Sequence, residues 1–427
     1  MTLYKYSEVI AIMLLIYFIR VIPLSFVVIY GAFLIAVCIT KNYFLAINGD
    51  KPSSGSLLLP LCQMLTEVMT VFITYNLGTL SLTRYAMIAA VITAFSVMYT
   101  ASASGRDFNF TIEPRHFFIA GSVLLIAGFV ISLRRTTAHQ SIEIFRTANF
   151  FFVMAGTLYA VNRDSKYILY TVMCAAAAIV PLFLILLRCH EIGTIMYVVI
   201  SDFLFLLILN IILRNWLSVG IILLISAGFF LAWLYLYNTP SAQELLNAAL
   251  NDWLGHDFSD QMSRLFIRYR SSDQLAYLNQ IVFGSVQSES LNKSEVLLSW
   301  APKLFAPMSY TEIVSWEDNA FTSAADYACS TMFYTNPIFS AVLFIGTIAV
   351  YVREIIHSVK RVTFVIPLGL LICSLIHILG NLLLFPFTGI PLPFLSYGWS
   401  SLITNTIIVI FFAYIEEFNT SDVEYER

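Results

Sequence analysis

The sequence has 427 residues, of which 59% are hydrophobic and only 11% are charged, and its formal net charge is −3. Soluble domains are about half apolar and a quarter charged, whereas the mean hydropathy here is +0.82. The composition predicts an all-α membrane protein, a polytopic helix bundle that we treat as a single integral membrane domain over residues 1–427. The weak negative charge offers no basic field, so nucleic-acid binding is excluded.

Ten apolar runs are close to the length of about 20 residues that a spanning helix needs. In chain order they cover residues 21–39, 57–78, 85–101, 116–133, 167–187, 192–213, 216–237, 327–352, 362–386 and 400–415. Two further runs leave an alternative open, because 7–19 is short and 142–161 carries Glu143 and Arg146. Each either lies in the membrane interface or spans. We therefore expect about ten spans, and up to twelve.

The basic residues set the expected topology, because Lys and Arg are enriched in short cytoplasmic loops. They cluster between residues 134 and 166 and between 353 and 361. This places both chain ends in the cytoplasm and makes the polar segment 238–325 one large extracytoplasmic loop. The loop begins with apolar and polar residues near a helical period, which predicts amphipathic helices on the membrane surface. The apolar start of the chain is expected to be retained and not cleaved.

A few polar residues lie inside apolar runs, where an ionisable group is costly. Glu67 and Asp202 should therefore face the bundle interior and have partners there. His377 has no second ligand at metal spacing, so we expect a satisfied core residue. The six cysteines form neither a disulfide framework nor a CxxC pattern. The sequence predicts no metal site.

The stretch FTGIPLPFLSYGWSS, residues 387–401, breaks the apolar pattern near the C-terminus with Gly389, Pro391 and Pro393. A broken backbone at membrane depth is tolerated only where protein or a wet cavity satisfies its polar groups. The stretch closely resembles the C-terminal signature of the SEDS (shape, elongation, division and sporulation) family of RodA- and FtsW-like proteins. Trp399 replaces a signature glycine. Weaker matches surround Pro114, Gly193, Gln280 and Asp326.

The resemblance implies a glycosyltransferase that polymerises the lipid-linked peptidoglycan precursor at the outer face of the bacterial cytoplasmic (inner) membrane. It implies a role in cell-wall synthesis, shape or division, and a class B penicillin-binding transpeptidase as partner. It makes Asp326 the catalytic aspartate and makes Glu191, Gln280, Ser396 and Tyr397 candidates for binding the polyprenyl-linked precursor. The sequence identifies no cofactor, although the acidic residues of the polar loop could coordinate a divalent cation on the diphosphate. Tyr334 and Thr335 stand where the family has two glutamates.

The residues themselves leave two interpretations open at each charged position. Asp326 joins the polar loop to an apolar helix, where it could act as a general base or simply cap the helix. Arg106 and Arg115 could offset the charge of a diphosphate leaving group, or could extend to lipid headgroups.

Two other functions remain as alternatives. The first is an O-antigen or capsule polymerase or ligase, which would depend on loop arginines such as Arg264, Arg268 and Arg270. The second is a non-catalytic SEDS-like scaffold or lipid-carrier transporter that keeps the fold and has lost the chemistry.

Overall fold

The computed structural model is mostly helical where it describes the chain, with short turns between helices, and no strand occurs in those residues. The described residues are 113–132, 138–162, 192–254, 328–335, 337–358, 362–382, 390–396 and 399–418, with scattered positions within 9–69 and 179–185. The chain divides into two compact units. Unit 1 comprises Met1–Thr111, Leu275–Val359 and Pro391–Ser421, and unit 2 comprises Ile112–Gln274, Lys360–Ile390 and Asp422–Arg427.

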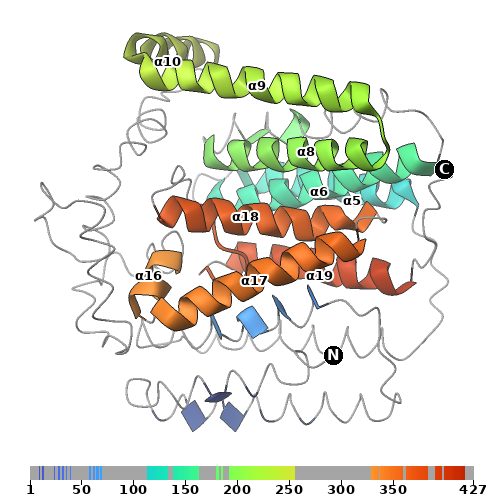
Figure 1. Ribbon diagram of the computed structural model, residues 1–427, viewed down its shortest axis with the longest axis vertical. Helices are drawn as coiled ribbons and strands as arrows, with labels where there is room; N and C mark the ends of the chain where they lie inside the picture. The colour runs from blue at the N-terminus through green and yellow to red at the C-terminus, as the bar shows by residue number, and fades with distance from the viewer. Residues whose placement is uncertain are drawn as a thin grey trace, which may run out of the picture. The chain divides into compact units, whose positions relative to one another are not determined.

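Unit 2 begins with a tightly packed antiparallel pair of helices, α5 (Pro114–Ser132) and α6 (Ala138–Asn162) (Figure 1). Two aromatic rings of α6 pack directly against two glycines of α5. A Cβ atom at Gly121 would lie 3.2 Å from the Phe152 ring, and one at Gly128 would lie 2.8 Å from the Phe145 ring. Glycine lets the two backbones approach closely, as is common between membrane helices.

Helix α6 is continuous over 25 residues and contains the run 142–161, which the sequence left between the interface and the membrane. Its Phe145 and Phe152 pack two turns apart along α5, and α5 is long and apolar enough to cross a membrane. Helix α6 itself is not among the described helices that are long and apolar enough to cross a membrane, so its two alternatives stay open.

Three more described elements pack in the core of unit 2: α8 (Ile192–Ile212), the short 3₁₀ helix η3 (Val362–Phe364) and α18 (Val365–Asn381). Each of them packs against α6, and Figure 1 shows α6, α8 and α18 running alongside one another. The rings of Phe205 and Phe364 lie 5.2 Å apart between α8 and η3. On α18, a Cβ atom at Gly369 would lie only 2.2 Å from Cζ of Phe150.

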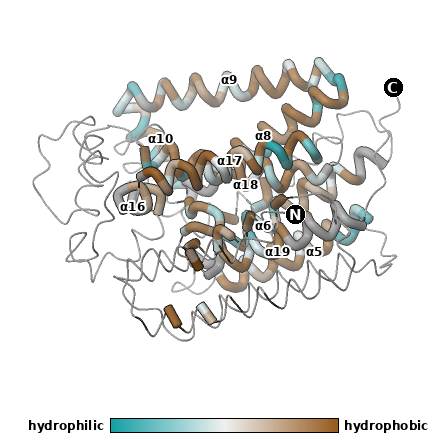
Figure 2. The backbone as a smooth tube through the Cα atoms, turned by 60° about the horizontal axis from the view of Figure 1, so that its bottom comes forward, coloured by the Kyte–Doolittle hydropathy of each residue, from teal (hydrophilic) through white to brown (hydrophobic). Residues whose placement is uncertain are grey.

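Helix α9 (Trp216–Asn238) folds back on α8 and presents large apolar side chains on most of its surface. Figure 2 shows hydrophobic residues along most of α9, with hydrophilic ones near its ends. A helix that is apolar all round and mostly exposed is typical of a lipid-facing span. Asn215 caps its first turn, since the Asn215 side chain accepts from the Ser218 backbone N–H.

Helix α10 (Pro240–Leu254) follows α9 and mixes apolar with polar residues. Gln243 closes the corner between them by donating from Nε2 to the Leu236 carbonyl at 2.7 Å. Leu245 is 72% exposed. The helix expected at the start of the polar segment is therefore present. The rest of that segment, residues 255–325, lies outside the described residues.

In unit 1, the expected span 327–352 is wrong in its bounds. The structure has a short helix α16 (Ala328–Thr335) and a separate helix α17 (Pro337–Ser358). Proline favours the first position of a helix and disfavours helical backbone in the residue before it. Pro337 therefore begins a new helix, which continues six residues beyond the expected end at Val352.

Helix α17 buries several polar side chains beside the apolar Leu343 and Phe344, and it exposes several large apolar ones. Its buried polar residues are Ser340, Thr347, Tyr351, Glu354 and Ser358. Its exposed apolar residues are Ile338, Val342, Ile345, Val352 and Ile356. The Glu354 carboxylate accepts from the Leu57 backbone N–H at 3.0 Å. Helix α19 (Trp399–Phe418) buries the polar Ser401 and Asn405, which are bonded to each other at 3.1 Å.

Three described helices are long and apolar enough to cross a membrane: Pro114–Ser132, Trp216–Leu236 and Ile338–Ser358. Tyr197–Ile212 and Val365–Asn381 are shorter apolar helices. These helices, with α19, correspond to six of the expected spans. The other expected spans lie wholly or largely outside the described residues, so the total of ten to twelve stays a prediction.

Candidate functional site

The structure describes only some of the predicted site residues. Five lie outside the described residues, namely Arg106, Glu191, Gln280, Asp326 and Tyr397, and Glu67 does too. Arg115 and Ser396 are described. No group of three or more His, Cys, Asp or Glu side chains that could hold a metal ion occurs in the described part of the chain.

Arg115 lies in the first turn of α5 and is exposed. Its Nε lies 2.7 Å from Glu113 Oε2, and its Nη2 donates to Glu113 Oε1 at 3.2 Å. An exposed pair of this kind contributes about 0–1 kcal/mol. Exchanging this carboxylate for another anion therefore costs little free energy. The guanidinium can also bind a phosphate group in a bidentate manner.

Residues 391–396 form a buried turn, which we call the signature turn. The Leu392 carbonyl accepts from the backbone N–H groups of Leu395 at 3.2 Å and Ser396 at 2.9 Å. In return, the Leu392 N–H donates to Ser396 Oγ at 2.6 Å. Phe394 has a φ of 64° and is 1% exposed. Hydrogen bonds within the turn thus hold its backbone, and the hydroxyl of the predicted binding residue Ser396 bonds to that backbone.

His377, on α18, fixes the residue that leads into the signature turn. Its Nδ1 lies 2.6 Å from the Ile390 carbonyl oxygen. A carbonyl only accepts hydrogen bonds, so Nδ1 is the donor. The Asn381 side chain donates to the His377 carbonyl at 3.0 Å, and His377 is 3% exposed. His377 is therefore a satisfied core residue, as expected.

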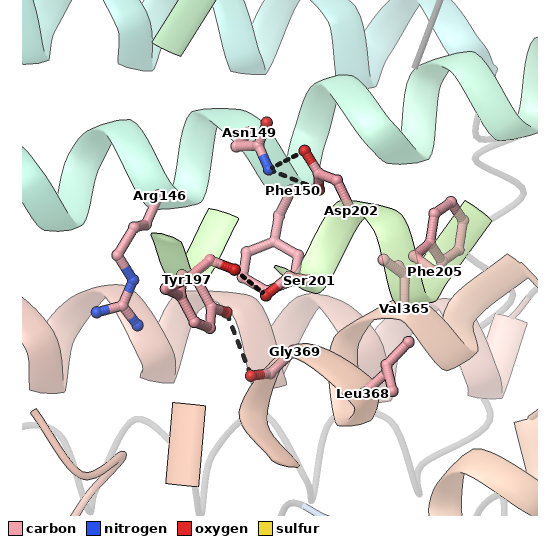
Figure 3. A pocket seen from close by; sticks show the side chains of 10 residues that line it. All are labelled: Arg146, Asn149, Phe150, Tyr197, Ser201, Asp202, Phe205, Val365, Leu368 and Gly369. Carbon is pink, nitrogen blue, oxygen red and sulfur yellow. Dashed lines mark hydrogen bonds between the residues drawn. The ribbon is translucent and has the colours of Figure 1, made fainter. Parts of the chain in front are cut away.

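A second buried polar cluster joins α6, α8 and α18 within unit 2. We call it the polar junction, and Figure 3 shows most of it. Its members are Glu143, Arg146 and Asn149 of α6, Tyr197, Ser201 and Asp202 of α8, and Gly369 and Cys373 of α18. All of the charged members are less than 9% exposed.

Arg146 is the most highly connected side chain of the polar junction. Its Nη1 donates to Glu143 Oε1 at 2.9 Å, and its Nη2 donates to Cys373 Sγ at 3.3 Å. The guanidinium carbon lies 4.7 Å from the centre of the Tyr197 ring. The Tyr197 hydroxyl donates to the Gly369 carbonyl at 3.2 Å. These contacts connect the ion pair of α6 to both neighbouring helices.

Asp202 has the interior partner that the sequence predicted. The Asn149 amide donates from Nδ2 to both carboxylate oxygens, at 3.0 and 3.2 Å (Figure 3). The sequence did not single out Asn149. A signal was available, because Glu143, Arg146 and Asn149 recur at a spacing of three residues on one face of a helix.

Comparison with known families gives one match. The model of the family described as "Cell cycle protein" (FTSW_RODA_SPOVE) matches residues 337–421. This segment contains α17, η3, α18, the signature turn and α19. No match was found among curated proteins. Over this C-terminal region, the chain is similar to the SEDS family of FtsW- and RodA-like membrane proteins.

Proposed function

We propose that this protein is a lipid-linked sugar polymerase that extends peptidoglycan at the outer face of the bacterial cytoplasmic membrane. The observation that carries the proposal is the signature turn, which lies inside the family match and has a defined, buried backbone. The exposed apolar side chains and buried polar side chains of α17 are consistent with a membrane protein.

In the proposed reaction, an acceptor sugar hydroxyl attacks the anomeric carbon of a polyprenyl-diphosphate-linked sugar. The new glycosidic bond forms as the bond to the diphosphate breaks, and the polyprenyl diphosphate leaves with the electron pair. Asp326 takes the hydroxyl proton as general base. Arg115 and Arg106 offset the negative charge that develops on the leaving group. Glu191, Gln280, Ser396 and Tyr397 contribute to the binding region.

Polymer formation by the purified protein tests this proposal. The wild type, with a class B penicillin-binding transpeptidase present, should form polymer from the lipid-linked precursor. Asp326→Asn should lose at least about 10²-fold of that rate, since the amide keeps the shape of the side chain but cannot take a proton. Asp257→Asn and Glu317→Gln serve as controls in the same polar segment. An added chelator reports whether a divalent cation assists.

One observation favours a non-catalytic scaffold as the second candidate. Tyr334 and Thr335, at the end of α16, replace the two glutamates of the family. A wild type that forms no polymer from any lipid-linked sugar would support the scaffold. If Arg264→Gln in the loop abolishes polymer formation and Asp326→Asn does not, an O-antigen or capsule type of polymerase or ligase is favoured.

A further inference from the structure

The polar junction contains a small cavity, and some polar atoms near it have no hydrogen-bond partner in the described structure. The cavity has a volume of about 10 Å³, close to the smallest space that holds one water molecule. Its polar lining comes from Arg146, Asn149, Tyr197, Ser201 and Asp202. Apolar cavities of this size stay empty, whereas polar ones are hydrated.

Almost all of the N–H and O–H groups that line the cavity already donate a hydrogen bond. The Ser201 hydroxyl donates to the Tyr197 carbonyl at 2.7 Å, and the Tyr197 hydroxyl donates to Gly369. The Asn149 Nδ2 donates to Asp202. In the described part of the chain, Arg146 Nε is the remaining buried donor of this group without a hydrogen-bond partner.

The acceptors of the lining are in surplus. A carboxylate offers about four lone-pair positions, and the Asn149 amide supplies the two hydrogen bonds seen on Asp202. The Asn149 Oδ1 atom is buried and has no hydrogen-bond partner in the described structure. Buried polar groups without partners are rare, and an ordered water is the usual explanation.

We propose that the cavity holds one buried water molecule, anchored by the Asn149–Asp202 pair. Water brings two donors to a lining that is rich in acceptors, and its oxygen can accept from a donor such as Arg146 Nε. A metal cation would also satisfy acceptors. It would, however, share this small cavity with the positively charged guanidinium of Arg146, so water fits the charge of the site better.

Hydroxyl-radical labelling tests the proposal in the intact protein. X-rays generate radicals from water where the water lies, so a side chain beside a bound water is oxidised even when it is buried. Phe205 lines the cavity and is 1% exposed. Phe117 and Phe145 are equally buried, at 1% and 0%, and do not line it. Phe205 should be oxidised several-fold faster than either. Equal rates at the three rings would overturn the proposal.

The double variant Asn149→Leu/Asp202→Leu removes the anchor. Replacing both partners with apolar groups avoids leaving one of them buried alone. In this variant the oxidation of Phe205 should fall to the rate of Phe145. Undiminished oxidation of Phe205 would show that the radicals do not come from a water held by this pair.

If the double variant does not fold, an isotope-labelling experiment on the wild type alone gives a second test. After rapid dilution into water enriched in oxygen-18, products at the exposed Phe118 should carry the heavy isotope at once. Products at Phe205 should acquire it later, because a buried water exchanges slowly. Simultaneous appearance at both rings would indicate access by bulk solvent and would contradict a bound water.

Discussion

The signature turn and the polar junction both bury polar groups, and they satisfy them in different ways. In the turn, Leu392 and Ser396 are four residues apart, and the bond from His377 to Ile390, the residue before the turn, spans 13 residues. In the junction, Asn149 and Asp202 are 53 residues apart, and Arg146 and Cys373 are 227 apart. The turn is therefore a local motif, whereas the junction exists only after three helices have packed.

Because of this difference, we expect the two regions to have different roles. A local turn keeps its shape through hydrogen bonds between its own residues, and under the proposed function it would hold a fixed backbone beside the substrate. A junction of long-range contacts contributes to the packing of α6, α8 and α18. We therefore expect changes in the junction to alter mainly stability and changes in the turn to alter mainly polymer formation.

The largest loss of stability is expected from Asn149→Leu. This change leaves the buried Asp202 carboxylate without the donor seen in the structure. Leaving a buried group without its hydrogen-bond partner costs about 1–3 kcal/mol, and more when the group is charged. Thermal unfolding in detergent should show this loss, and Asn149→Leu/Asp202→Leu should recover most of it. Equal loss in the single and double variants would mean that the pair itself is not what matters.

Gly369→Ala should have the next largest effect. The added Cβ atom would lie 2.2 Å from Phe150 Cζ, so α18 and α6 must separate or the ring must move. Overpacking of this kind costs about 1–3 kcal/mol. Gly346→Ala on α17 is the matched control, because a Cβ atom there would have no neighbour within 4 Å. Similar melting temperatures for the two variants would contradict the close packing of α6 and α18.

Ser396→Ala should have a smaller effect on stability. It removes the acceptor of the Leu392 N–H, and a hydrogen bond of this kind contributes about 1 kcal/mol. Ser122→Ala is the control, since Ser122 is only partly buried and its hydroxyl bonds within its own helix. If Ser396→Ala unfolds at the wild-type temperature, the side-chain bond is not needed to hold the turn.

Arg115→Gln should have the smallest effect on stability, about 0–1 kcal/mol, because its pair with Glu113 is exposed. Its effect on polymer formation separates the two interpretations of this residue. Glu113→Gln breaks the same ion pair and leaves the arginine in place. A diphosphate-binding role predicts slower polymerisation in Arg115→Gln alone, whereas equal rates in both variants would leave Arg115 as a headgroup contact.

The sequence predicts the helices that are continuous apolar runs, such as α8, α9 and α18. It leaves the place of α6 open, because Glu143 and Arg146 interrupt the apolar run. The structure shows that these two side chains form an ion pair. The division between α16 and α17 is also missed, although Pro337 marks it.

The candidate site also divides into features that the sequence predicts and features that it does not. The signature turn is recognisable in the sequence because its glycine and prolines are consecutive. The need of Asp202 for a partner could be predicted from the cost of burying a carboxylate. The identity of that partner could not, since Asn149 is 53 residues away and meets Asp202 only through the packing of α6 on α8.

The most direct test of this division is the rate of polymer formation per folded molecule. His377→Leu removes the donor to Ile390, whereas His377→Asn keeps an N–H close to the position of Nδ1. The account predicts that His377→Leu polymerises slowly, that His377→Asn regains the rate, and that Asn149→Leu/Asp202→Leu polymerises at the wild-type rate once corrected for folded protein. A wild-type rate in His377→Leu together with a slow double variant would contradict it.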